Sequence, residues 1–165
     1  ECLFKRPSNI SGDRISDYQV VKHALKVFEI KKKKKIDIIL LLQPTAPLRK
    51  VKHIKDVIKK IVDGNLDSVW SVSKVDLKYH PLKQLIIKNG QLNYFDIKGK
   101  NIIARQQLSN TYVRNGAVYA ITRKCIKKNK NLIGKKSKAY IINSDQISID
   151  TLADIKKVSK LFKIY

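Results

Sequence analysis

The sequence predicts an α/β fold in which helices cover both faces of one β-sheet. Segments with apolar residues at helical spacing alternate along the 165 residues with short apolar runs, and the connections between them are short. There is no internal repeat and no low-complexity linker, so we expect one domain, 1–165. A composition of 43% hydrophobic and 30% charged residues is typical of a globular chain that can bury a core.

The first half of the chain is expected to form helix, strand, helix and strand in that order. Apolar residues recur at helical spacing over about 16–34, and the apolar run at 36–42 is typical of a buried strand. A second helical pattern covers 51–62 and ends at Gly64 as its C-terminal cap. The run SVWSVSKV at 68–75 then predicts a second strand.

A hairpin interrupts this alternation. The pair Asn89-Gly90 lies between two strand-like runs, 85–88 and 92–95, and favours the tight turn of a two-residue hairpin loop. We therefore expect 78–110 to be an arm inserted into the domain.

The α/β pattern resumes after the arm. Strands are expected within 115–122 and 139–143. Thr151 begins the last helix, and Asp154 three residues later completes a capping box.

The chain is strongly basic, with 36 Lys and Arg against 13 Asp and Glu and a formal net charge of +23. Such a charge can bind polyanions, nucleic acid included. The alternative is a compositional bias, because lysine far outnumbers arginine and the lysine runs carry no interleaved aromatics for base stacking. We expect no nucleic-acid partner and leave open a use of the charge in binding smaller anions.

Cysteine spacing and hydropathy exclude two classes of protein. Cys2 and Cys125 do not have the spacing of a metal site, and free thiols of a cytoplasmic protein are expected. No apolar stretch approaches the roughly 20 residues of a membrane span, so we expect no membrane partner.

The stretch LLQPTAPLR at 41–49 directly follows the first predicted strand. In open α/β sheets, ligands bind at the carboxyl ends of strands. Pro44 and Pro47 restrict the backbone there, and the Gln43 amide can both donate and accept hydrogen bonds with a polyhydroxy ligand. Gln43 is therefore a candidate binding residue. The alternative is a strand-end residue that bonds the neighbouring backbone.

Polar side chains also crowd ARQQLSNTYVRNGAVYA at 104–120. Gly116, next to Asn115, permits close approach of a backbone or a ligand. Arg105 can hold a carboxylate or phosphate through two hydrogen bonds, with a surface ion pair as the alternative. Tyr119 is either a pocket residue or a core aromatic.

The stretch SIDTLADI at 148–155 places two carboxylates at the start of the last helix. Asp150 is a candidate ligand for a magnesium ion that carries phosphates. Asp154 is better explained as the capping residue of the helix.

Together these motifs resemble the acylneuraminate (CMP-sialic acid) cytidylyltransferases. KRPSNISGDRISDYQVVKHAL at 5–25 is similar to the family's RP…L…D…S…V…HAL, and LLQPTAPLR to its LLQPTSPLR, with Ala46 in place of Ser. LDSVWSVSKVDLKYHPLK resembles a D-S-V-x-S-V segment followed by His-Pro. RQQLSNTYVRNGAVY is similar to RQ-x-LP-x-x-Y-x-x-NGAIY, and SIDTLADI to IDT-x-x-DL. All five occur in the family's order.

The resemblance implies a three-layer, nucleotide-diphosphosugar-transferase-like (Rossmann-like) fold with a mixed sheet and a dimerisation arm at 78–110. It also implies the activity: CMP is transferred from CTP, with Mg²⁺, to the anomeric hydroxyl of a nine-carbon α-keto acid sugar, and pyrophosphate is released. Sialic acid and bacterial analogues such as legionaminic acid are the expected sugars, for cell-surface polysaccharide synthesis. A homodimer is the expected assembly.

The resemblance assigns a role to each candidate residue. Gln43, Asn115 and Tyr119 line the sugar pocket, and Arg49 fixes the loop at this substrate site. Asp150 is the magnesium ligand.

Two further residues, Lys83 and Arg105, are implied to reach from the arm into the partner subunit's site and to hold anionic groups there.

The chain departs from the family pattern at three places. The Gly/Arg/Ser/Lys-rich loop that cradles the triphosphate has no counterpart, so we expect an N-terminally truncated form that is inactive alone. Ser148 stands where the family often has Asp, and Val113 where it commonly has Arg. The alternative function is a non-catalytic remnant, a basic protein that binds anions or a partner.

Overall fold

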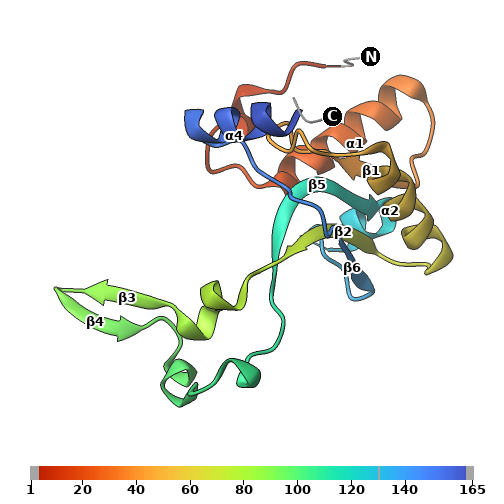
Figure 1. The fold of residues 1–165 in the computed structure, drawn as a ribbon. Helices are drawn as coiled ribbons and strands as arrows, with labels where there is room; N and C mark the ends of the chain where they lie inside the picture. The colour runs from red at the N-terminus through yellow and green to blue at the C-terminus, as the bar shows by residue number, and fades with distance from the viewer. Residues whose placement is uncertain (1–3, 130, 163–165) are drawn as a thin grey trace.

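The computed structural model describes residues 4–129 and 131–162. Its centre is a four-stranded mixed sheet in the order β1-β5-β2-β6 (Figure 1). The strands are β1 (Ile38–Leu41), β2 (Ser68–Lys74), β5 (Tyr112–Thr122) and β6 (Ser137–Ile141). β5 runs antiparallel to both of its neighbours, β1 and β2, whereas β2 and β6 are parallel.

Helices cover both faces of the sheet because successive side chains of β5 point to opposite sides. Val118 and Ala120 pack in one cluster with residues of α2 (Val51–Asp63). Tyr119 and Ile121 pack in a second cluster with α1 (Asp17–Lys32) and α3 (Arg123–Lys128). A last helix, α4 (Leu152–Phe162), follows β6. The predicted α/β fold with a mixed sheet is confirmed.

Gly64 caps α2 as predicted, whereas the capping role of Ser16 in α1 was not predicted. Ser16 caps α1, where its hydroxyl accepts the Gln19 N–H and the Gln19 side chain bonds the Ser16 backbone in return. Gly64 is the C-cap of α2 with a helical φ of −85°, and Asn65 takes the left-handed φ of 44° instead. A Cβ on Gly64 would lie 2.9 Å from Leu66 Cγ, so the glycine is needed there for space.

The first predicted strand is shorter and less buried than its apolar sequence indicates. The prediction covered 36–42 as a buried strand, whereas β1 is Ile38–Leu41 and all four residues are half-buried. In the part of the sheet that the structure describes, β1 is an edge strand paired only with β5. Because one edge has no neighbouring strand there, its side chains keep partial access to solvent.

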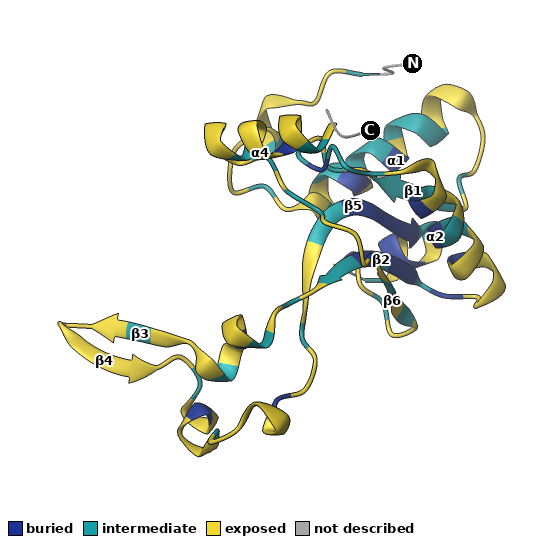
Figure 2. Ribbon diagram, viewed as in Figure 1, coloured by how far each residue is buried: buried dark blue, intermediate teal, exposed yellow. Residues whose placement is uncertain are grey.

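Between β2 and β5 the chain leaves the sheet and projects away from it (Figure 1). The segment contains the hairpin β3 (Leu85–Lys88) and β4 (Gln91–Tyr94), joined through Asn89 and Gly90 with φ of 51° and 77°. Positive φ at both turn residues is the geometry expected of an Asn-Gly hairpin. Most of this segment is exposed (Figure 2). The boundaries 78–110 and the dimerisation role stay predictions.

Cys125 is a buried free thiol whose pKa is raised by burial. Cys2 lies outside the described residues. Among the described helices, none has the length and apolar character needed to cross a membrane.

Candidate functional site

The candidate site lies where the loop after β1 meets the first half of β5. The antiparallel register pairs Leu41 with Tyr119, so the chain after Leu41 runs alongside the residues before Tyr119. The Gln43 N–H donates to the Gly116 carbonyl oxygen at 3.1 Å. The two stretches selected from the sequence, LLQPTAPLR and RNGAVY, are therefore in contact.

A bulge in β5 forms the centre of the site. Trp70 of β2 pairs with Tyr119, but Val72 pairs with Arg114, so Ser71 lies opposite an expanded stretch of β5. Such a bulge bends the strand and changes the direction of its side chains. Gly116 has a φ of 69°, which glycine adopts without strain.

Gly116 also lets β5 approach the loop after β1 closely. A Cβ at this position would lie 3.1 Å from Gln43 Cβ and 3.2 Å from Gln43 Cγ. The glycine predicted to permit close approach therefore does so toward Gln43, a neighbouring protein segment.

Arg49 ties the loop to the bulge. Its Nε donates to the carbonyl oxygen of Ala117, and its Nη2 donates to the carbonyl oxygen of Gln43 at 2.5 Å. Burial lowers the pKa of the guanidinium. With two of its nitrogens bonded to backbone, Arg49 holds the loop against β5, and its role at a substrate site stays a prediction.

The side chain of Gln43 extends toward the start of α1. Its Nε2 lies 3.4 Å from Asp17 Oδ2, a hydrogen bond at the long limit. Its carbonyl oxygen Oε1 has no hydrogen-bond donor among the described residues. The Gln43 amide thus keeps an acceptor for a ligand hydroxyl.

Asn115 is held by two serines of β2. Its Oδ1 accepts hydrogen bonds from Ser71 Oγ at 2.6 Å and from the Ala117 N–H at 3.2 Å. Its Nδ2 donates to Ser73 Oγ at 3.0 Å. These bonds fix the position of the Asn115 amide before any ligand arrives.

Tyr119 is mostly a core residue with its hydroxyl at the bulge. It is 3% exposed, and its ring stacks on Trp70 with centroids 4.4 Å apart. The hydroxyl accepts the Gly116 N–H at 2.8 Å. Burial is the main cause that raises its pKa.

Asp150 lies next to the same loop, because the Ile149 N–H donates to the Thr45 carbonyl oxygen at 2.9 Å. Asp154 is the capping residue: its Oδ2 accepts from Thr151 N at 3.0 Å and from Thr151 Oγ1 at 2.7 Å. These bonds, led by that of the Thr151 hydroxyl, lower the pKa of Asp154. Asp150 is exposed, and its carboxylate bonds no other described residue.

Lys83 and Arg105 are separate from these residues. Both lie on the projecting segment, in short 3₁₀ turns, and both line a cavity of about 250 Å³ together with Leu82 and Tyr94. Within one chain this segment extends away from the sheet (Figure 1). The structure thus brings Gln43, Arg49, Asn115 and Tyr119 together with Asp150 beside them, and places the two arm residues elsewhere.

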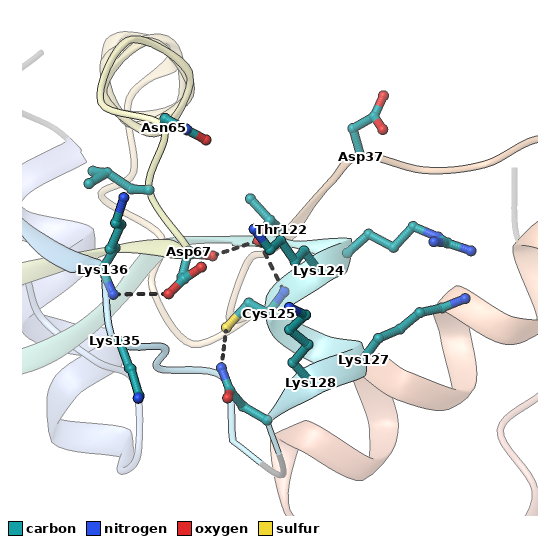
Figure 3. Close-up of a pocket in the computed structure, with 13 residues that line it drawn as sticks. Asp37, Asn65, Asp67, Thr122, Lys124, Cys125, Lys127, Lys128, Lys135 and Lys136 are labelled. Atoms are coloured by element: carbon teal, nitrogen blue, oxygen red, sulfur yellow. Dashed lines mark hydrogen bonds between the residues drawn. The ribbon is translucent and has the colours of Figure 1, made fainter.

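A cavity of about 840 Å³ lies at the other end of the sheet, where β1, β2 and β6 begin and β5 ends (Figure 3). It is lined by six Lys and Arg side chains, of which Lys128 and Lys135 are examples, and by Asp37 and Asp67. Because Asp67 occupies its middle, the cavity does not present a uniformly positive wall (Figure 3). The candidate residues lie at the opposite end.

Sequence reasoning missed the serines that support Asn115. Ser71 is fully buried, and a serine at an inward position of an apolar strand is a signal that was present in SVWSVSKV. This buried serine points to Asn115 only once the bulge in β5 is known, because the bulge brings Asn115 next to Ser71. Asp17 was missed because it lies far from Gln43 in sequence, and an acidic residue in the first turn of a helix such as α1 is common.

No group of three or more potential metal-ligating side chains, counting His, Cys, Asp and Glu, occurs in the described residues. A magnesium ion that keeps water and substrate phosphates as ligands needs only one or two carboxylates. The carboxylate of Asp150 is exposed.

No family model matches the sequence. The chain is 26% identical over 165 residues to the post-translational flagellin modification protein B of Campylobacter coli, covering 99% of this chain and 68% of that protein. It is 28% identical to an N-acylneuraminate cytidylyltransferase of Streptococcus agalactiae, covering 99% and 38%. It is 31% identical to the CMP-N,N'-diacetyllegionaminic acid synthase of Legionella pneumophila, covering 78% and 55%.

A solved structure of a CMP-2-keto-3-deoxy-manno-octonic acid synthetase complexed with CTP has the same fold, with a TM-score of 0.59 at 13% identity. The match covers 92% of this chain and 69% of that chain. The chain spans 38% and 55% of the two named sugar enzymes above. The resemblance seen in the five motifs is confirmed: the chain is related, over nearly its whole length, to the acylneuraminate cytidylyltransferases.

Proposed function

We propose that the protein acts in the transfer of CMP from CTP to a nine-carbon α-keto acid sugar. The anomeric hydroxyl oxygen attacks the α-phosphorus and gives up its proton to water, the bond from that phosphorus to the bridging oxygen breaks, and pyrophosphate leaves. The observation that carries the proposal is the contact between the Gln43 loop and the Asn115 bulge, with Asp150 beside the loop. The sequence similarity to cytidylyltransferases supports the proposal.

The sugar is proposed to bind between Gln43 and Asn115. Gln43 offers an amide oxygen to the sugar hydroxyls, and Arg49 keeps the loop that carries it in place. Rigid placement of such groups lowers the entropy cost of bringing the hydroxyl in line with the phosphorus. Tyr119 supports the bulge that carries Asn115, because its hydroxyl accepts the Gly116 N–H.

Asp150 is proposed to hold Mg²⁺ together with the phosphates of CTP. Its carboxylate is a hard oxygen ligand of the type that Mg²⁺ prefers, and it is exposed next to the loop after β1. When bound, the metal neutralises charge on the triphosphate. Asp154 is excluded from this role because its carboxylate caps α4.

The projecting segment is proposed to form the contact with a second copy of the chain. It exposes large apolar side chains, with Ile87 75%, Leu92 67% and Phe95 60% exposed. Grouped exposed apolar side chains mark interaction surfaces. In such a dimer, Lys83 and Arg105 would hold anionic groups at the partner's site, because within one chain the segment that carries them points away from the Gln43 loop.

The test is pyrophosphate release from CTP with Mg²⁺ and a panel of nine-carbon keto-sugars, sialic acid and legionaminic acid among them. It is measured on this chain and on a chain extended upstream, because this chain alone is expected to be inactive. Release that requires both CTP and one of the sugars supports the proposal. An exposed-surface variant such as Lys55→Ala serves as the folded control. The proposal is wrong if no sugar supports release by either chain, and sugar or CTP binding without turnover in both would favour the anion-binding remnant.

A further inference from the structure

A fully buried serine lies at the point where β2 faces the bulge. Ser71 is 0% exposed, and its Oγ accepts the Val118 N–H at 2.8 Å. A hydroxyl that accepts from an N–H must direct its own hydrogen elsewhere. The acceptor in reach is Asn115 Oδ1 at 2.6 Å. Because Ser71 Oγ already accepts from the Val118 N–H, it is Ser71 that donates to Asn115.

The same bonds decide which end of the Asn115 amide points inward. The Ala117 N–H can only donate, and it lies 3.2 Å from the atom assigned as Oδ1. The Ser71 hydroxyl donates to that atom as well. Two donors converge on one atom, which is therefore the oxygen, and both of its lone pairs are engaged.

The Asn115 nitrogen faces the other way. One of its hydrogens goes to Ser73 Oγ at 3.0 Å, and the second has no acceptor among the residues that the structure describes. With its oxygen engaged and one N–H left, Asn115 can act toward a ligand only as a hydrogen-bond donor. Gln43 differs, because its oxygen is not engaged in this way.

We propose that Ser71 is a positioning residue of the site, which orients Asn115 so that it presents an N–H to the sugar. The ligand atom taken there is an oxygen that accepts, such as a carboxylate or acyl carbonyl oxygen of the keto acid sugar. This inference rests on the proposed function for the nature of the ligand. The orientation of Asn115 rests on the hydrogen bonds alone.

The chain offers a matched control for a purely structural role of Ser71. Ser68 lies on the same strand, is also 0% exposed, and bonds Ser137 Oγ at 2.7 Å. It precedes the part of β2 that faces the bulge and does not contact Asn115. Ser71→Ala and Ser68→Ala each remove one buried hydroxyl from β2, so both are expected to lower the Tm.

Only Ser71→Ala is expected to change the site. The KM for the sugar rises about tenfold, the scale of one lost hydrogen bond, while the KM for CTP is unchanged. Asn115→Asp keeps the oxygen that Ser71 needs and replaces the donor by a second acceptor. It is expected to weaken sugar binding more than Ser71→Ala does, because the new oxygen repels an acceptor.

Side-chain NMR of Asn115 tests the orientation without any turnover. In the wild type, the Nδ2 hydrogen that bonds Ser73 Oγ should exchange slowly with solvent. Ser71→Ala should shift the Nδ2 signals and speed this exchange, while Ser68→Ala should not. Unchanged Asn115 signals in Ser71→Ala overturn the positioning role whatever the activity is. Equal effects of Ser71→Ala and Ser68→Ala on the KM for the sugar overturn it as well. If the wild type binds no sugar, the proposed function is contradicted. If the Asn115 signals of Ser71→Ala are altered all the same, the positioning role of Ser71 is supported.

Discussion

Arg49 donates a hydrogen bond to the carbonyl oxygen of Ala117, so the loop after β1 is fastened to the bulge of β5. A second bond, from Arg49 Nη2 to the Gln43 carbonyl oxygen, closes the loop on itself. The guanidinium is suited to this because its donors form a rigid fork that reaches two carbonyls at once. One side chain therefore connects two segments that lie far apart in sequence.

Arg49→Lys is expected to destabilise the protein by about 2 kcal/mol, because an ammonium cannot satisfy both carbonyl oxygens and one stays without its charged partner. Urea unfolding followed by circular dichroism measures this loss. The matched control is Arg14→Lys, which changes an exposed arginine and should leave the unfolding midpoint unchanged. Equal midpoints for the two variants would contradict the role of Arg49.

Gly116→Ala is expected to be more destabilising than Gly90→Ala, although both glycines have a positive φ, 69° and 77°. A left-handed backbone costs a non-glycine residue about 1–2 kcal/mol at either position. A Cβ at residue 90 meets nothing within 4 Å, whereas at residue 116 it meets Gln43 Cβ at 3.1 Å. Thermal unfolding of both variants separates strain from this contact, and Gly116→Ala should in addition weaken sugar binding. Equal losses of stability would show that the contact with Gln43 carries no energy.

The hydrophobic pattern predicted the main helices and strands in their order, but not the short helix α3. The capping box of Thr151 and Asp154 and the Asn89-Gly90 turn are local signals, since the residues that form them are neighbours in sequence. The burial of β1 was overestimated because an apolar run does not show whether a strand has one neighbour or two.

The site was predictable only in part, because its support depends on contacts between distant segments. Gln43 and Asn115 were found as polar residues beside apolar strands. The bond of Ser71 to Asn115 depends on a register shift in β5, and the sequence contains no local mark of it except Gly116. The roles of Lys83 and Arg105 depend on a second chain and stay predictions.

His53 is expected to make stability depend on pH. It is 7% exposed, and its Nδ1 accepts the Lys50 N–H at 3.2 Å at the start of α2. Burial, with the nearby Lys50 charge, lowers the pKa of His53 below its ordinary value of 6.5. The unfolded chain then binds a proton more readily than the folded one, so stability is lost as the pH falls below about 6.5.

Urea unfolding at pH 8, 7, 6 and 5 measures this dependence, and His53→Gln removes the imidazole as the titrating group. The decrease between pH 7 and 5 should be smaller in His53→Gln than in the wild type. His23→Gln is the control for loss of a histidine outside α2. An identical slope in wild type and His53→Gln would assign the pH dependence to other groups.

Asp150→Asn and Asp154→Asn are expected to change different properties, although the two residues are only four positions apart. Asp150→Asn should change the Mg²⁺ dependence of activity, and Asp154→Asn should change the Tm. Asp154 caps α4 through Thr151, so Asp154→Asn lowers the Tm and leaves the Mg²⁺ concentration for half-maximal activity unchanged. The Asp150 carboxylate bonds no described residue, so Asp150→Asn keeps the Tm. If Asp150 holds the metal, this variant needs at least tenfold more Mg²⁺ or loses activity, because a neutral amide is a weaker ligand for a hard cation.

Pyrophosphate release titrated with Mg²⁺ and thermal unfolding separate the two effects. A lower Tm in Asp150→Asn together with unchanged Mg²⁺ dependence would assign both carboxylates to the helix and remove Asp150 from the metal site.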